Sequence, residues 1–255
     1  MDTPQFKRIK MSRRDRTAVL TLASDKVNAL DREVLQEVSH FVAFCEQDPG
    51  VGALVITGEG SVFSAGLNVN VLLGNERSYT DGLLADLSAA LLSLFRCPKP
   101  TVAAINGSAI AGGCLLASTC DKRLMAEEAR IGVTELRVGV SFPIVAIEIL
   151  RHACGARAEQ LIFDAGLLDA DTAHQCGLVH QRVPRTELQS EAMVAAEQLA
   201  SLDPDAYALA KASTRRFALA AMQDEDGRAV DVLVLDHWKN DDTRASLERL
   251  LKPKA

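Results

Sequence analysis

The first two-thirds of the chain alternate between short apolar runs and amphipathic segments. Short runs predict strands at 5–11, 16–22, 51–58, 101–106, 122–126, and the start of 130–140. The run at 51–58 is nearly continuously apolar, which is typical of a strand that is buried on both faces. Apolar residues at helical spacing predict a helix that opens at Asp31, a second over 81–96, and a third over 142–154. This alternation favours an α/β fold with parallel strands.

The last third of the chain is mainly helical from about residue 156. One strand is predicted at 178–183, and we expect helices broken at Pro184 and Pro204. Between the first two strands we expect a charged turn at 12–15. The helical tail is too amphipathic to stand alone, so we expect it to pack on the core or on another subunit.

Composition narrows the class of protein. The chain has 255 residues and is 48% hydrophobic, which suits one large domain. The net charge is −6 and no basic block occurs, so a nucleic-acid footprint is not supported. No apolar run approaches the ~20 residues of a membrane span, and the first residues lack the apolar stretch of a secretory signal. We therefore expect a cytoplasmic protein with no nucleic-acid or membrane partner.

The metal- and redox-active residue types form no site pattern. The five histidines lack the spacing of metal ligands, so no metal is predicted. The six cysteines lie in apolar segments without a CxxC pair, which favours free thiols in a reducing compartment. They are Cys45, Cys97, Cys114, Cys120, Cys154, and Cys176.

Two adjacent glycines interrupt the small apolar stretch 105–121. Gly112 and Gly113 precede CLLAST, a run that suits a short helix. A helix start presents unpaired backbone N–H groups, and a glycine lets a ligand approach them closely. One hypothesis is therefore half of an oxyanion hole. The alternative is that the glycines only permit tight packing between helix and strand.

The loop VFSAGLNVN offers a second small turn after a strand. Its backbone N–H groups near Leu67 are candidates for the other half of an oxyanion hole. The segment is not the GxSxG elbow of serine hydrolases, so Ser64 is a poor nucleophile candidate.

Glu135 is the best candidate for a proton carrier. Its neighbours in RIGVTELRVGV are mostly apolar, namely Ile131, Val133, Leu136, Val138, and Val140. A carboxylate among apolar side chains has its pKa raised by desolvation, which suits a general base near neutral pH. The alternative is an ordinary glutamate on an exposed loop.

Five segments in this order resemble the crotonase (enoyl-CoA hydratase/isomerase) superfamily. They are VNAL, VFSAGLN, NGSAIAGGCLLASTCD, RIGVTELRVGV, and GLLDADTAHQCGLVHQRVP. The resemblance covers nearly the whole chain. It implies an α/β spiral of ββα turns in residues 1–184, which hold the site for an acyl-CoA thioester. It also implies a C-terminal helical region, 185–255, that forms a homotrimer or a dimer of trimers.

The resemblance also implies the roles of individual residues. Glu135 is the expected catalytic acid/base, and the amides of Leu67 and Gly112 are the expected oxyanion hole. Further substrate contacts are expected at Ala29, Ala65, Gly66, Asn68, Gly113, and Leu115. No cofactor is expected beyond the CoA moiety of the substrate.

Leu115 separates two activities within the superfamily. Hydratases of this superfamily have a glutamate at the position that matches Leu115 and another at the one that matches Glu135. With Glu135 alone, the expected reaction is proton transfer between C2 and C4 of the acyl chain. This is the reaction of the Δ3,Δ2-enoyl-CoA isomerases of fatty-acid β-oxidation. The segment AGGCLLASTCD resembles the mitochondrial type of these isomerases. Two alternatives stay open. One is a hydratase that recruits Glu127, Glu128, or Glu148, and the other is a non-catalytic acyl-CoA-binding member.

The remaining expectations concern the rest of the substrate. The superfamily usually has aspartate where this chain has Asn68, beside the CoA entrance. Candidate contacts for the CoA phosphates are Lys26, Lys239, and Lys252. Candidate walls of the acyl pocket are Leu72, Leu73, Leu84, and Phe142.

Overall fold

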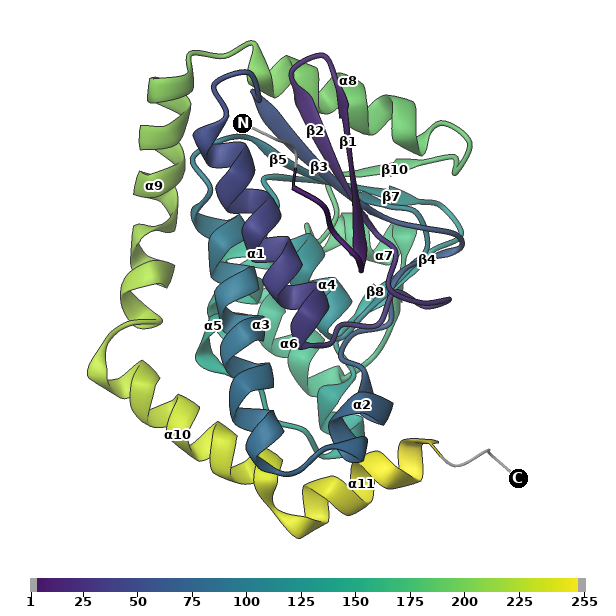
Figure 1. Ribbon diagram of the computed structural model, residues 1–255, viewed down its shortest axis with the longest axis vertical. Coiled ribbons are helices and arrows are strands. Elements are labelled where there is room, and N and C mark those ends of the chain that lie inside the picture. The colour runs from purple at the N-terminus through teal and green to yellow at the C-terminus, as the bar shows by residue number, and fades with distance from the viewer. Residues whose placement is uncertain (1–3, 252–255) are drawn as a thin grey trace.

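The computed structural model describes residues 4–251, which form two sheets surrounded by helices (Figure 1). The six strands of the large sheet lie in the order β1-β2-β3-β5-β7-β10, and only the β1–β2 pair is antiparallel. They are β1 (Ile9–Arg14), β2 (Thr17–Leu22), β3 (Ala53–Gly58), β5 (Thr101–Ile105), β7 (Lys122–Ala126), and β10 (Gln181–Val183). The small sheet contains β4 (Val62–Ser64), β6 (Ser108–Ile110), β8 (Arg130–Gly132), and β9 (Leu168–Asp169).

Three consecutive turns of the chain repeat one unit. Each contributes a strand to the large sheet, the next strand to the small sheet, and then helical structure. The helical parts are α2 (Val69–Gly74) and α3 (Ser78–Arg96), then α4 (Gly112–Ser118), then the 3₁₀ helix η1 (Glu135–Val138) and α5 (Ile144–Cys154). The predicted α/β spiral of ββα turns is confirmed.

The first helix forms where the pattern predicts it. Asp31 caps α1 (Arg32–Gln47) by accepting a hydrogen bond from the Val34 N–H at 3.0 Å. The six apolar residues at helical spacing are all buried, and α1 packs on α3. Residues that the sequence places on one helix face therefore form part of the core.

Two predicted boundaries are wrong. The first hairpin turns at Asp15 and Arg16 and not over 12–15, because Arg14 still pairs with Thr17. The second helix begins at Ser78, one turn before Asp81. The predicted breaks at the two prolines are confirmed: Pro184 lies between β10 and the helix that begins at Leu188, and Pro204 is the first residue of the next helix, where its missing N–H costs nothing.

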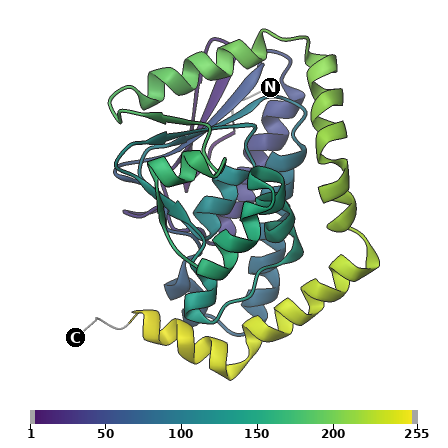
Figure 2. The same ribbon diagram turned by 180° about the vertical axis from the view of Figure 1, so that it is seen from behind.

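The C-terminal third folds around the outside of the spiral. After α6 (Arg157–Asp164) and α7 (Ala170–Gln175), α8 (Leu188–Ala200) packs on the large sheet. Figures 1 and 2 show α9 (Pro204–Ala221), α10 (Glu225–Lys239), and α11 (Asp241–Leu251) along the outer rim. Since α8 covers the sheet, it belongs to the core packing. The division at residue 184 and the oligomerisation role of 185–255 stay predictions.

Neither a membrane span nor a disulfide was expected from the sequence. Among the helices of residues 4–251, none is long and apolar enough to cross a bilayer. All six cysteines are free, as the sequence predicts, and four of them are fully buried.

A buried charge cluster fastens α9 to the core. Asp121 accepts hydrogen bonds from Lys211 Nζ and Arg215 Nη2, each at 2.7 Å, and from the Thr101 N–H at 2.8 Å. Lys211 and Arg215 are the buried residues of α9 and are only 7% and 3% exposed. A buried ionic contact therefore takes the place that apolar packing usually has in holding a helix to a core.

The same cations satisfy the ends of other helices. Arg215 donates to the carbonyl of Phe95 near the end of α3, and to that of Thr119, which ends α4. Arg123 donates to the Cys120 carbonyl just after α4 at 2.6 Å. The last carbonyls of a helix lack intrahelical partners and carry partial negative charge, so buried cations stabilise them. This arrangement accounts for several buried cations around a single carboxylate.

Removal of the carboxylate leaves two buried cations without their counter-ion. We expect Asp121→Ala to lower the free energy of unfolding by roughly 3–5 kcal/mol, measured by urea denaturation. The control is Glu59→Ala, which removes an exposed partner of Lys10 and should cost less than about 1 kcal/mol. Equal losses in the two variants would contradict the importance of this cluster.

Candidate active site

An apolar cavity of about 280 Å³ is lined by all three turns of the spiral and by the C-terminal helices. The loops after β4 and β6 supply Ala65, Leu67, and Gly112, and η1 supplies Glu135. The opposite walls come from the segment 140–143 and from α10 and α11. The rest of the lining is nearly all apolar, so the cavity suits an apolar ligand with a few polar contacts.

The structure brings five of the nine predicted site residues together around this cavity. Ala65, Leu67, Gly112, Leu115, and Glu135 all line it. The other four, Ala29, Gly66, Asn68, and Gly113, do not line it. Gly66, Asn68, and Gly113 instead make contacts within and between the two loops that supply the lining residues.

Hydrogen bonds from Ser64 and Leu30 fix the loop that precedes Leu67. The fully buried Ser64 hydroxyl donates to the Asn28 carbonyl at 2.8 Å and accepts from the Gly66 N–H at 3.2 Å. The backbone of Leu30 binds the residues on both sides of Leu67. The Leu30 N–H donates to the Gly66 carbonyl, and the Leu30 carbonyl accepts from the Asn68 N–H, both at 2.8 Å. Ser64 is therefore a structural link, in agreement with its dismissal as a nucleophile.

The two predicted loops touch through their backbones. Gly66 has a φ of +88°, and a Cβ there would lie 2.9 Å from the Ala111 Cβ and 3.1 Å from the Gly112 nitrogen. A Cβ on Gly113 would collide with the carbonyl oxygen of Ser64. Only glycine fits at both positions. The alternative reading of the glycine pair, tight packing, is thus correct for Gly113.

Gly112 differs from Gly113. It is the first residue of α4, and a Cβ there would meet only the end of the Leu30 side chain, 3.2 Å away. That Cβ would, however, stand 3.7 Å from the Leu67 nitrogen, and both Leu67 and Gly112 line the cavity. Within residues 4–251, neither the Leu67 nor the Gly112 N–H donates a hydrogen bond to another protein group. Two neighbouring amides therefore remain available to one acceptor.

The turn into α4 is strained. Ala111 has φ 53° and ψ −121°, a conformation that non-glycine residues rarely adopt. Two hydrogen bonds hold it, from its N–H to the Gly132 carbonyl at 2.9 Å and from the Leu115 N–H to its carbonyl at 3.0 Å. Backbone strain of this kind concentrates at functional sites, where surrounding structure sustains it.

Glu135 has the electrostatic character that the sequence predicts for a base. Burial raises the pKa of its carboxyl to about 7, although the backbone N–H groups of Thr134 and Glu135 partly oppose the rise. Its Oε2 is buried without a hydrogen-bond partner. The apolar surroundings are those of the cavity and not all of the predicted sequence neighbours, because Leu136 is 43% exposed.

No second carboxyl group faces Glu135. Among the described residues that line the cavity, Glu135 is the only one with an ionisable side chain. Leu115 is 2% exposed and presents an alkyl wall. Glu127 and Glu128 are exposed, and Glu148 pairs with Arg151 at 2.7 Å and is not part of the cavity lining.

The predicted acyl walls are only partly correct. Phe142 lines the cavity, but Leu72, Leu73, and Leu84 do not. Leu87, one helical turn after Leu84, takes the expected place on α3. Sequence reasoning missed Trp238, Leu247, and Leu250, whose only signal was their position on amphipathic C-terminal helices.

The positions next to the presumed CoA entrance have other partners. Asn68 caps α2 by accepting from the Val71 N–H at 3.1 Å, a contact that aspartate makes equally well. Ala29 donates to Asp25 Oδ1 at 3.1 Å. Lys239 pairs with Asp81, whereas Lys26 is exposed, and Lys252 lies outside the described residues.

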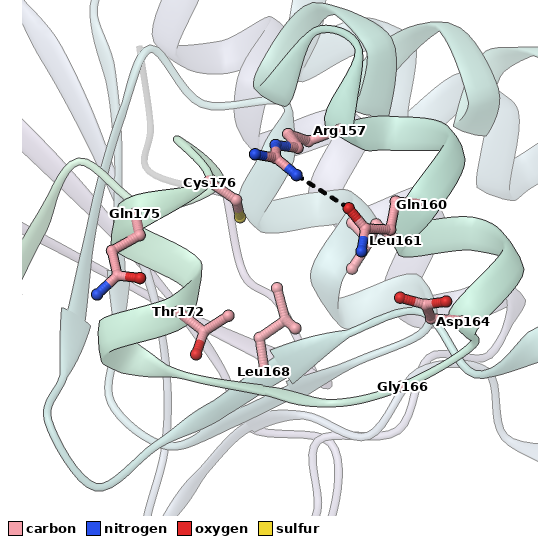
Figure 3. A pocket seen from close by; sticks show the side chains of 9 residues that line it. All are labelled: Arg157, Gln160, Leu161, Asp164, Gly166, Leu168, Thr172, Gln175 and Cys176. Atoms are coloured by element: carbon pink, nitrogen blue, oxygen red, sulfur yellow. Dashed lines mark hydrogen bonds between the residues drawn. The ribbon is translucent and has the colours of Figure 1, made fainter.

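A second cavity has none of these features. It lies between α6 and α7, as Figure 3 shows, and has a volume of about 230 Å³. Arg157 and Gln160 hydrogen-bond to each other at 3.1 Å across its rim. None of the predicted site residues lines it. In the described part of the chain, no group of three or more His, Cys, Asp, or Glu residues is arranged to hold a metal.

Known proteins resemble this chain in both sequence and structure. A model of the family "Enoyl-CoA hydratase/isomerase" matches residues 13–252. A candidate enoyl-CoA hydratase of Thermus thermophilus is 36% identical over 208 residues, 80% of this chain and 81% of the relative. Human mitochondrial enoyl-CoA delta isomerase 1 is 33% identical over 203 residues, 78% of this chain and 67% of the relative.

The similar solved structures also include both enoyl-CoA isomerases and enoyl-CoA hydratases. Human mitochondrial Δ3,Δ2-enoyl-CoA isomerase superposes with a TM-score of 0.90 at 29% identity, covering 96% of this chain and 97% of the other. An enoyl-CoA hydratase of Bacillus anthracis superposes with a TM-score of 0.76 at 25% identity, covering 96% of each. The shared fold, the two glycine turns, and the match over most of the sequence agree: the chain belongs to the enoyl-CoA hydratase/isomerase family of the crotonase superfamily.

Proposed function

We propose that this protein is a Δ3,Δ2-enoyl-CoA isomerase with Glu135 as its single acid/base. The observation that carries the proposal is the lone ionisable side chain in an apolar cavity, opposite a leucine. A carboxyl group whose pKa is near 7 is present in both its protonated and deprotonated forms at neutral pH. An isomerase needs both forms in every turnover.

The proposed reaction moves one proton. The Glu135 carboxylate removes a proton from C2 of a 3-enoyl thioester, and the electron pair of the broken C–H bond delocalises onto the thioester oxygen. The amides of Leu67 and Gly112 donate to that oxygen and stabilise the dienolate. Glu135 then returns the proton at C4, and the double bond lies between C2 and C3.

The remaining predicted contacts have positioning roles in this proposal. Ala65 and Leu115 shape the cavity beside the thioester. Gly66 and Gly113 allow the two loops to approach, and Asn68 fixes the start of α2. The CoA moiety is the only cofactor-like group that the reaction needs.

The hydratase alternative has support only from the names of relatives. Water addition in the hydratases that the sequence resembles uses two carboxylates, and Leu115 occupies the second position. No described residue replaces it, because Glu127, Glu128, and Glu148 lie outside the cavity lining. An alkyl group neither orients nor activates a water molecule, so we favour proton transfer over hydration.

We also propose that the chain forms a homotrimer or a dimer of trimers. The outer faces of α9 and α10 carry large apolar residues that the isolated chain leaves exposed. Leu209, Phe217, Val232, and Leu233 are 60–72% exposed. Exposed apolar patches of this kind are typical of protein–protein contacts.

Removal of the base should abolish turnover. We expect Glu135→Gln to lower the rate of double-bond migration roughly 10²–10⁴-fold while acyl-CoA binding persists. For the wild type, kcat/KM should rise with pH through an inflection near 7, because only the carboxylate accepts the proton. The assay follows 2-enoyl and 3-enoyl thioesters of several lengths. Near-normal turnover by the glutamine variant would refute the role of Glu135.

Introduction of a second carboxyl group tests the one-acid argument. We expect Leu115→Glu to gain measurable hydration of crotonyl-CoA, because it supplies the missing partner for a water molecule. The control Leu115→Gln has the same length but no charge and should gain none. Since Leu115 is buried, thermal unfolding must show that each variant still folds. Efficient hydration by the unmodified protein would exclude the isomerase assignment.

The two adjacent glycines should respond differently to a single methyl group. We expect Gly112→Ala to keep its stability and lose roughly 10²-fold in kcat, because the Cβ crowds the site of the thioester oxygen. Gly113→Ala should instead destabilise the fold, because its Cβ overlaps the Ser64 carbonyl. Urea unfolding and steady-state kinetics of both variants measure this contrast. A fully active Gly112→Ala enzyme would remove Gly112 from the oxyanion hole.

A further inference from the structure

Trp238 separates the catalytic cavity from a second, smaller space. The indole is 8% exposed and lines the apolar cavity that contains Glu135. It also lines a neighbouring space of about 10 Å³, between α2, α3, α10, and α11, which Leu72 and Leu73 border. Trp238 and Leu247 are the only residues that line both. They therefore form a partition between the two.

Hydrogen bonds hold this partition in place. The indole Nε1–H donates to the Ser141 carbonyl at 2.8 Å. Nearby on α10, Asp231 accepts from the Ile144 N–H at 2.8 Å, and on α11 the Thr243 hydroxyl donates to the Gly139 carbonyl at 3.3 Å. The C-terminal helices thus bind both ends of the segment that carries Phe142, so the indole is fixed relative to this part of the cavity wall.

The volume indicates how long a chain fits in front of the partition. A cavity of about 150 Å³ accommodates benzene, so by proportion about 280 Å³ accommodates roughly eleven carbon-sized atoms. The lining around Trp238 consists of aliphatic and aromatic side chains such as Leu87, Val138, and Phe142. Such a surface favours a hydrocarbon tail.

We propose that Trp238, supported by Leu247, is the end wall of the acyl site and limits the substrate to acyl chains of roughly ten carbons or fewer. This inference rests on the proposed function in one respect only, namely that the cavity takes the acyl chain. It does not depend on whether the chemistry is isomerisation or hydration. It assigns a specificity role to a residue that lies 103 positions after Glu135 in the chain.

Equilibrium binding of saturated acyl-CoA thioesters tests the end wall without any turnover. Isothermal titration calorimetry over C4 to C16 should show the wild-type Kd falling up to about C10 and no further. Each additional buried methylene is worth about fourfold in Kd. For Trp238→Ala the fall should continue, so that the C14 thioester binds at least about fourfold more tightly than to the wild type. Trp238→Leu should shift the limit in the same direction and guards against a misfolded alanine variant.

Two controls separate the wall from general loosening. Trp238→Phe keeps an aromatic wall and loses the hydrogen bond to Ser141, so its length limit should stay near that of the wild type. Leu84→Ala removes a buried leucine from α3 that does not line the cavity and should also leave the limit unchanged. An unchanged limit in both Trp238→Ala and Trp238→Leu overturns the proposal, as does a wild-type affinity that rises steadily to C16. Failure of every acyl-CoA to bind would refute the proposed function itself.

Discussion

The candidate site depends on one contact, the direct approach of the backbone of 64–67 to that of 111–113. A glycine lies at each crossing, and Gly66 and Gly113 leave no room for a side chain. The Ser64 hydroxyl fixes the first loop by bridging the Asn28 carbonyl and the Gly66 N–H. The strands that precede these loops, β4 and β6, pair in parallel, so the small sheet brings the two loops side by side.

The short helix α4 links this contact to the stability of the whole chain. Its first residue, Gly112, lies at the cavity, and its end is held by the buried cluster around Asp121. A helix of seven residues has little stability of its own, so tertiary contacts at both ends must define its position. Arg215, far from the cavity, therefore contributes to the position of the Gly112 amide through α4. The Gly112 amide, one of the two proposed oxyanion donors, is in this sense preorganised by a buried ionic contact at the other end of the helix.

The sequence predicted those features whose signal is local. The helix cap at Asp31, the glycine turn, and the apolar setting of Glu135 each follow from a few neighbouring residues, and the structure contains all three. The cavity wall was not predictable in this way. Trp238 donates a hydrogen bond to Ser141, which lies 97 positions earlier in the chain. The hydrophobic pattern of neither segment indicates that the two residues are in contact. The choice of Leu84 over Leu87 failed for a similar reason, since both lie on the buried stripe of α3 and only the packing of α10 and α11 decides which faces the cavity.

The isolation of Glu135 is the feature on which the proposed one-carboxyl mechanism depends. Desolvation moves its pKa toward neutrality, whereas hydrogen bonds from two backbone N–H groups keep the carboxylate form accessible. A stronger partner, such as a nearby cation, would stabilise the carboxylate and hinder return of the proton to carbon. A second acid would compete for the proton and attract water into the apolar cavity. Leu115 avoids both effects, so in the proposed isomerase its alkyl side chain supports catalysis by leaving the charge on Glu135 undisturbed.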